Sequence, residues 1–181
     1  MKLTGKTRTP RQARPADDRL NPEKSFGYMV RRCHRRFDRL LSFHLAPYEV
    51  KTGFWYYLRV LWIKNRVTQK YLSDMTNVSE NTTVSMIAGM EKADLVTRQK
   101  DDVDRRKIIV SLTERGKAFE KKLIDNVLRI NDVATQGIDR AELDVCAHVL
   151  TRMSENLARE WDRLQRGKKE ARQESDDEES N

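Results

Sequence analysis

Three consecutive charged or basic positions, Asp104, Arg105 and Arg106, stand between two short runs of β-branched and basic residues. The runs, Val96–Lys100 and Lys107–Leu112, predict two paired strands, which places the charged residues at a hairpin tip. An arginine on such a tip can enter the minor groove of DNA, and a neighbouring carboxylate can hold its guanidinium by a charge-assisted hydrogen bond. The pattern predicts a contact with DNA. The alternative is an exposed ion pair worth under about 1 kcal/mol.

Short polar side chains gather at the start of a helix predicted over residues 79–92. Ser79 is a typical N-cap, and Val84, Ile87 and Met90 are expected to form the buried side of the helix. Such a helix fits the major groove, where threonine methyls contact thymine and asparagine binds adenine, with phosphate contact as the open alternative. The candidate DNA contacts outside the hairpin tip are Gln69, Lys70, Ser79, Asn81, Thr82, Thr83, Ser85 and Arg98.

Helical periodicity dominates the elements around these residues. Asn21-Pro22 predicts the start of a first helix and Pro47 its end. The apolar face of that helix and the near-heptad stripe over 143–164 each need a partner, which predicts a homodimer built from both terminal regions. Further helices are expected over about 54–64, 68–75 and 79–92, and from Thr113 to roughly residue 136. Thr68 is the predicted N-cap of the helix over 68–75.

Charge is distributed unevenly along the chain of 181 residues. Residues 1–20 carry a net charge of +4 and residues 170–181 one of −5, which leaves +9 on the middle. A basic body favours a polyanionic partner such as double-stranded DNA, although charge alone also fits a merely soluble surface. The predicted division is a disordered basic arm (1–20), a helical dimerisation region (21–47 and 117–166), a DNA-binding domain (48–116) and a disordered acidic tail (167–181).

The remaining composition limits the function classes. Cys33 and Cys146 are far apart and without C-x-x-C spacing, which fits a reducing cytosol and no structural zinc site. The three histidines have no metal-ligand spacing, so neither a metal nor a cofactor is expected. No apolar run is long enough to span a membrane or to direct export, which predicts a cytoplasmic, nucleoid-associated protein without a membrane partner.

Motifs over residues 55–116 resemble those of the MarR family (multiple antibiotic resistance regulator type). They are Thr68-Gln69-x-x-Leu72-Ser73, Thr82-Thr83, Met90-Glu91, Leu95-Val96-x-Arg98, Asp104-Arg105-Arg106 and Val110-Ser111-Leu112-Thr113-x-x-Gly116. The D-x-R tip followed by a hydrophobic residue and x-L-T-x-x-G is the specific part. One departure is Ala93-Asp94, where the family commonly has glycine, which suggests a slightly different turn.

The resemblance implies a mainly α fold with a small β-hairpin wing: a winged helix-turn-helix joined to a helical dimerisation region. It further implies a homodimeric regulator, usually a repressor, that binds a pseudo-palindromic operator. Family members often release DNA when a small aromatic or phenolic compound, or an oxidant, acts in the cleft between the two domains. No enzyme activity is implied, and the sequence has no phosphate-binding glycine loop, H-E-x-x-H motif or nucleophile elbow.

An aromatic carboxylate or phenolic effector would need aromatic walls, an imidazole and a guanidinium. The resemblance places such side chains between the first two helices, with ordinary packing as the alternative for each of them. The candidate effector-binding residues are Tyr28, His34, Phe37, His44, Trp55, Tyr56 and Arg59.

Two other readings remain open at this point. Arginines beside Cys33 would favour a reactive thiolate, which predicts a thiol-based redox-sensing repressor, although a buried structural thiol fits its helix position better. The basic arm and body instead suggest an architectural DNA-binding protein that has no effector. A preference for one palindrome separates a regulator from an architectural protein.

Overall fold

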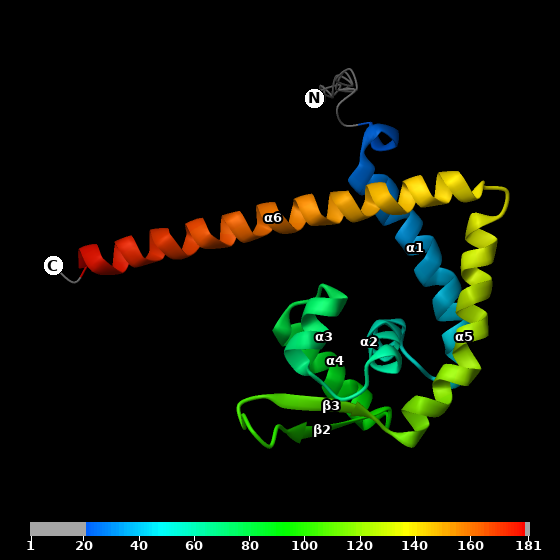
Figure 1. Ribbon diagram of the computed structural model, residues 1–181, viewed down its shortest axis with the longest axis horizontal. Coiled ribbons are helices and arrows are strands. Elements are labelled where there is room, and N and C mark those ends of the chain that lie inside the picture. Colours follow the sequence, from blue (N-terminus) through cyan, green and yellow to red (C-terminus); the bar gives the residue numbers. More distant parts are fainter. Residues whose placement is uncertain (1–20, 180–181) are drawn as a thin grey trace, which may run out of the picture. The chain divides into compact units, whose positions relative to one another are not determined.

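The computed structural model describes residues 21–179, so the predicted basic arm (1–20) lies outside the described residues. The chain divides into two compact units, one ending at Ile130 and the other beginning at Asn131. In chain order the elements are η2 (Pro22–Lys24), α1 (Phe26–Leu45), η3 (Ala46–Tyr48), α2 (Thr52–Ile63), β1 (Val67–Thr68), α3 (Gln69–Thr76), α4 (Glu80–Lys92), β2 (Val96–Lys100), β3 (Ile108–Leu112), α5 (Glu114–Thr135) and α6 (Arg140–Glu179), as labelled in Figure 1.

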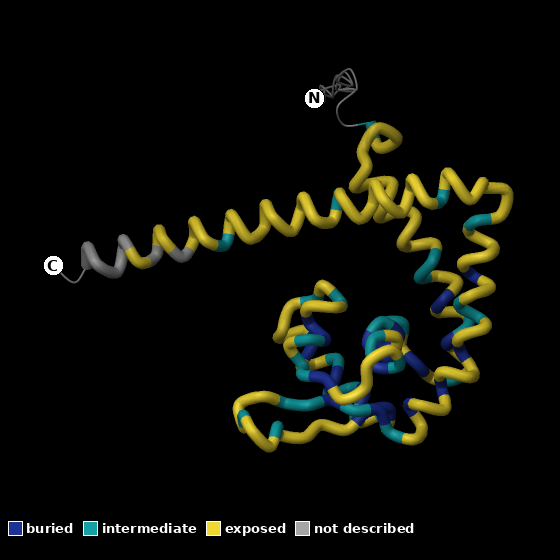
Figure 2. The backbone as a smooth tube through the Cα atoms, viewed as in Figure 1, coloured by how far each residue is buried: buried dark blue, intermediate teal, exposed yellow. Residues whose placement is uncertain are grey.

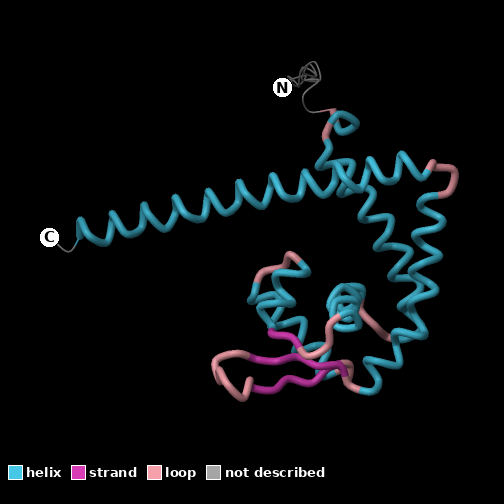
Figure 3. The backbone as a smooth tube through the Cα atoms, viewed as in Figure 1, coloured by secondary structure: helices cyan, strands magenta, loops and turns pink. Residues whose placement is uncertain are grey.

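A three-stranded antiparallel sheet in the order β1-β3-β2 packs with α2, α3 and α4. Val96 pairs with Leu112 at the base of the hairpin, and Lys100 pairs with Ile108 beside the tip (Figure 3). The hairpin confirms the predicted wing, whereas the two-residue strand β1 was not predicted. The fully buried side chains include Leu58, Leu61, Leu72, Ile87, Met90, Leu95, Val96 and Val110.

Local capping fixes the helix-turn-helix. The Thr68 hydroxyl accepts the amide of Tyr71 at 3.0 Å, and the Ser79 hydroxyl accepts the amide of Thr82 at 3.3 Å, as both N-cap predictions required. Asn77 ends α3 in the left-handed conformation, with φ of 52°. Asparagine tolerates that conformation well, so α3 stops here and the chain can enter α4 after a short turn.

The T-x-x-G motif joins the wing to α5. The Thr113 hydroxyl donates to the Asp94 carbonyl at 2.6 Å and accepts the Gly116 amide at 3.0 Å. A Cβ at Gly116 would lie 2.1 Å from the Leu95 carbonyl oxygen, so only glycine fits. The Trp62 indole donates to the Gly116 carbonyl at 3.0 Å and ties α2 to the same place. Asp94 has φ of 55°, the left-handed conformation that explains why glycine is favoured at this position.

Two sequence predictions about helix ends were wrong. The helix predicted to start at Asn21-Pro22 is only a 3-10 turn, and α1 begins at Phe26 with Ser25 as its N-cap. At the other end, α6 continues through Gly167 to Glu179 instead of giving way to a disordered tail from residue 167. Lysine, glutamate, arginine, glutamine and alanine make up most of residues 168–179, and their high helix propensity outweighs one glycine.

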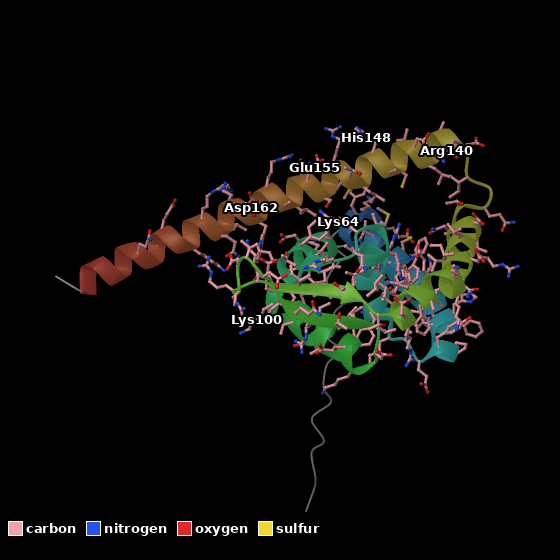
Figure 4. All side chains as sticks on the ribbon, turned by 60° about the horizontal axis from the view of Figure 1, so that its bottom comes forward. Lys64, Lys100, Arg140, His148, Glu155 and Asp162 are labelled. Carbon is pink, nitrogen blue, oxygen red and sulfur yellow. The ribbon has the colours of Figure 1, made fainter. Side chains whose placement is uncertain are left out.

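Burial differs sharply between the elements (Figure 2). Buried residues concentrate in α2, α4, α5 and the sheet, whereas α1 buries only Leu41 and Leu45, and no described residue of α6 is buried. Figure 4 shows the labelled α6 side chains Arg140, His148, Glu155 and Asp162 standing along that helix. None of the helices over residues 21–179 is both long and apolar enough to cross a membrane.

Candidate DNA-binding surface

The face that α4 buries differs by one position from the predicted face. Thr83 is fully buried, and its hydroxyl lies 3.0 Å from the Tyr57 hydroxyl of α2 in a buried hydrogen bond. Thr83, Ile87 and Met90 follow i, i+4, i+7 spacing and face the core, while Val84 is 46% exposed. The predictions that Thr83 contacts DNA and that Val84 is buried are therefore wrong.

The exposed start of α4 presents short side chains of mixed polarity. Asn81, Thr82, Val84 and Ser85 are exposed there. The Ser79 and Thr82 hydroxyls lie 2.9 Å apart, and Ser85 donates to the Asn81 carbonyl at 3.2 Å. These local bonds engage the hydroxyls, whereas the exposed Asn81 amide makes no side-chain hydrogen bond among the described residues.

The wing tip is held together by two carboxylates. Asp101 accepts the amides of Val103 at 3.1 Å and Asp104 at 2.8 Å, which closes the turn. Asp104 then accepts the Arg106 guanidinium Nε at 3.0 Å and the Arg106 amide at 3.2 Å. The Arg106 side chain is nevertheless 91% exposed. Hydrogen bonds from Arg106 hold the pKa of the Asp104 carboxyl below its usual range, so the pair stays charged at neutral pH.

A groove of about 610 Å³ connects the wing to the helix-turn-helix. Lys70 stands in it and pairs with Asp74 at 3.3 Å and Glu80 at 3.2 Å. The hydrogen bond that Lys70 donates to Glu80 is the main cause of the raised pKa of Lys70. The groove is lined by Thr68, Gln69, Lys70, Tyr71, Asp74, Glu80, Val84, Arg106, Lys107 and Ile108, so it joins the predicted contacts Gln69 and Lys70 to Arg106.

Other predicted DNA contacts lie at the edges of this surface. Arg105 is exposed at the wing tip beside Arg106. Lys100, which is labelled in Figure 4 and was not among the predicted contacts, ends β2 where the tip begins. Arg98 is instead engaged with Glu91 at the end of α4, with the guanidinium Nε 2.8 Å from the carboxylate. That hydrogen bond lowers the pKa of Glu91 and makes Arg98 a brace between β2 and α4.

The predicted effector residues come together only in part. The Tyr56 hydroxyl of α2 donates to Asp38 of α1 at 2.7 Å and lies 3.3 Å from His34 Nε2. The His34 and Tyr56 rings stack with their centroids 6.2 Å apart. Burial, the Asp38 hydrogen bond and the Asp38 charge raise the pKa of Tyr56, while the nearby Arg59 guanidinium opposes the rise. Asp38 was missed by the sequence prediction, although its i, i+4 spacing from His34 could have indicated it.

The remaining effector candidates lie elsewhere. Trp55 is 2% exposed and packs edge-on against Trp62, so it offers no free ring face. His44 is half-buried with Phe43 edge-on to its ring, and Phe37 packs against the core. Tyr28 lies among the arginines of α1. Cys33 is exposed in this chain, contrary to the expectation of a buried thiol.

Within residues 21–179, a capped pair of helices beside a three-stranded sheet with a charged hairpin tip defines a winged helix-turn-helix protein. The model of the MarR family matches residues 55–108, the segment from α2 to the start of β3. Residues 55–108 therefore carry a MarR-type domain, which confirms the resemblance seen in the sequence.

Relatives and solved structures agree with this assignment. The chain is 31% identical over 68 residues to the "Organic hydroperoxide resistance transcriptional regulator" of Bacillus subtilis; the match covers 38% of this chain and 46% of that protein. A MarR transcriptional regulator from Methanosarcina mazei Go1 is 25% identical, with a TM-score of 0.66 over 72% of this chain and 94% of its own. BpsR of Bordetella bronchiseptica, whose DNA binding is regulated by 6-hydroxynicotinic acid, is 20% identical; its TM-score is 0.67 over 73% of this chain and 94% of its own.

Proposed function

We propose that this protein is a transcriptional regulator, acting as a repressor, that binds a pseudo-palindromic DNA operator as a homodimer. The observation that carries the proposal is the continuous surface from the exposed start of α4, across the Lys70 groove, to the wing tip. A helix start of short side chains suits base edges in the major groove, and an arginine tip suits the narrow minor groove beside it.

Each part of this surface has a separate task in the proposal. Asn81, Thr82 and Val84 contact base edges, with the methyl groups favouring thymine. Gln69, Lys70, Ser79, Ser85 and Arg105 contact phosphates and fix the register. Asp104 holds Arg106 before DNA arrives, so less side-chain entropy is lost when the guanidinium enters the minor groove.

Homodimer formation follows from the apolar surface that the terminal helices expose. A single α6 helix cannot leave such a stripe in water without a partner, and α1 exposes Met29, Val30, Leu40 and Phe43 as well. A two-fold axis would set the two recognition helices about 34 Å apart, which matches successive major grooves. The exposed apolar side chains of α6 are Val145, Val149, Leu150, Leu157, Trp161 and Leu164.

The effector in this proposal is a small hydroxylated aromatic acid bound where α1 meets α2. Asp38 repels a carboxylate but accepts a phenolic hydroxyl, and Arg59 supplies the guanidinium for the acid group. The ligand-regulated DNA binding of BpsR fits this class of compound. Tyr56 contacts α1 and its neighbour Tyr57 bonds Thr83 of α4, so a ligand that displaces Tyr56 acts on the recognition helix through a single turn of α2.

Selection from random duplexes tests the DNA-binding proposal. The expected result is one pseudo-palindrome, bound with an affinity at least about 10³-fold above that of unrelated DNA. Binding without sequence preference would contradict the regulator proposal and favour an architectural DNA-binding protein instead.

A screen of hydroxylated aromatic acids for operator release tests the effector site. Arg59→Ala and Asp38→Asn should leave operator affinity intact and raise the concentration of compound needed for release by about tenfold or more, as expected for loss of one charged contact. His44→Ala, which changes a side chain outside the Tyr56 cluster, is the matched control. Unchanged sensitivity in both cluster variants would place the effector elsewhere.

A thiol switch is the second candidate function, favoured by the exposure of Cys33 beside Arg32 and by the similarity to a hydroperoxide resistance regulator. Peroxide would then oxidise the thiol to a sulfenic acid and release DNA. Cys33→Ser separates the two candidates, because a variant that still responds to an aromatic acid but not to peroxide assigns the two signals to different sites. A variant that responds to peroxide like the wild type excludes the thiol switch.

A further inference from the structure

Five arginines form a row along one face of α1: Arg31, Arg32, Arg35, Arg36 and Arg39, hereafter the arginine row. All five are exposed, and with Tyr28 they line a hollow of about 350 Å³. No residue of the operator-binding surface described above belongs to this hollow.

The charges of the arginine row have no counter-ion among residues 21–130, the described part of their own compact unit. None of the five makes an ion pair or a side-chain hydrogen bond there, whereas Arg98 and Arg106 of the winged domain each bond a carboxylate. Asp38 is the one acidic residue of α1, and it already accepts the Tyr56 hydroxyl. Like charges three and four residues apart destabilise a helix, so this concentration favours binding of an anion.

The arginine row also points away from the packed side of its helix. At about 100° per residue, its centre lies about 150° around the helix from Phe37, Leu41 and Leu45, which pack into or against the core. The guanidinium groups therefore face away from the core of their own subunit, and all five are exposed to a large anion.

Spacing and chemistry both suit a phosphate backbone. Residues 31–39 extend about 12 Å along the helix axis, the length over which one DNA strand carries roughly three to four phosphates. A guanidinium offers paired donors that match phosphate oxygens, which a lysine ammonium does not. DNA is also the anion at the highest local concentration, because a dimer bound to an operator is surrounded by other segments of the same duplex.

The arginine row lies apart from the wing within the same unit. Figure 1 shows the N-terminal half of α1 remote from β2 and β3, and the main contacts of α1 are with η2, η3 and α2. A duplex seated on α4 and the wing therefore leaves the arginine row free for another segment. We propose that the arginine row binds the phosphate backbone of a second duplex segment without sequence preference, so that one dimer bridges two stretches of DNA. This inference rests on the proposed operator binding.

A capture assay tests the bridge. The full chain is loaded on an immobilised operator duplex, washed, and offered a labelled 40-base-pair duplex without operator sequence. The wild type should retain the labelled duplex, and a variant with all five arginines of the row changed to Gln should retain at least about tenfold less while holding the operator equally well. The five-fold Arg→Lys variant keeps the charge and should recover part of the capture, which separates lost contacts from lost folding.

Three results decide between the inference and its competitors. If the Gln variant captures the labelled duplex as the wild type does, the arginine row does not bind DNA. A shift of the dimer equilibrium in sedimentation, with capture unchanged, would assign the arginine row to the subunit interface instead. If no operator exists, direct binding to the labelled duplex still tests the arginine row: loss in the Gln variant but not in Arg106→Ala would uphold the inference while the proposed function fails.

Discussion

The winged domain and the terminal helices use the same residue types in opposite ways. In the winged domain many large apolar side chains form a buried core, as with Leu61, Leu72 and Met90, which are fully buried. In α6 comparable residues stay in solvent, with Leu157 70% and Trp161 61% exposed. The winged domain completes its own core, whereas α6 leaves exposed the apolar side chains that the proposed homodimer would bury.

Charged residues show the same contrast. Glu91 and Asp104 brace Arg98 and Arg106 inside the winged domain and fix where their charge is presented. The arginine row of α1 has no such brace among residues 21–130, the described part of its own unit. A braced arginine suits one defined groove, because its geometry is set before binding. Arginines without such a carboxylate partner suit a DNA phosphate backbone, which a protein can bind at many positions along the duplex.

A charge placed in the apolar stripe of α6 should give the largest free-energy change of the variants considered. Leu157→Glu places a charge in the proposed dimer interface, and the two-fold axis repeats it in both subunits. We expect a loss of about 2–4 kcal/mol of association energy per subunit, so that analytical ultracentrifugation shows monomers with a lowered melting temperature. Thr151→Glu adds the same charge off the apolar stripe of α6 and should remain dimeric. If the Leu157→Glu protein stays dimeric like the Thr151→Glu control, the apolar stripe of α6 has a partner other than the second subunit.

Breaking the winged domain from within should cost somewhat less. Gly116→Ala forces a methyl group to within 2.1 Å of the Leu95 carbonyl oxygen, where the backbone cannot yield easily. We expect a destabilisation of about 3 kcal/mol, at the upper end of the usual cost of overpacking, measured by urea unfolding. Gly27→Ala, in α1, meets nothing within 4 Å and serves as the control. A stable Gly116→Ala protein would show that the T-x-x-G junction tolerates a shift of the wing.

What the sequence could predict depends on how local the deciding interaction is. Thr68, Ser79 and the wing tip act within a few residues, so capping and turn chemistry identified them. Which face of α4 is buried depends on the hydrogen bond between Thr83 and Tyr57, which lies 26 residues earlier in the chain. Because that partner is distant in sequence, only the i, i+4, i+7 spacing could have indicated the buried face. Asp38 was missed for the same reason, because its role appears only when α2 brings Tyr56 to it.

The wing should contribute a moderate share of operator affinity. Arg106→Ala is expected to weaken binding by about 1–3 kcal/mol, a normal cost for one groove contact, with little change in stability because the side chain is 91% exposed. Asp104→Asn keeps the guanidinium but removes its charged brace, so fluorescence anisotropy should show a smaller loss. Wild-type binding by Arg106→Ala would mean that the wing does not enter the groove.

Removal of the buried hydrogen bond between Thr83 and Tyr57 should give the smallest effect. We expect it to lower stability without changing DNA recognition. Thr83→Val keeps the volume but leaves the Tyr57 hydroxyl without its partner, which should cost about 1–2 kcal/mol of unfolding free energy. Tyr57→Phe should cost a similar amount, while the double variant should cost less than the two together, because it leaves no buried hydroxyl unpaired. Base preference, measured by operator selection, should be unchanged in Thr83→Val and altered in Thr82→Val. The reason is that Thr82 is exposed on α4, whereas Thr83 is buried. A changed preference in Thr83→Val would instead mean that α4 rotates when it meets DNA and exposes the face that the free chain buries.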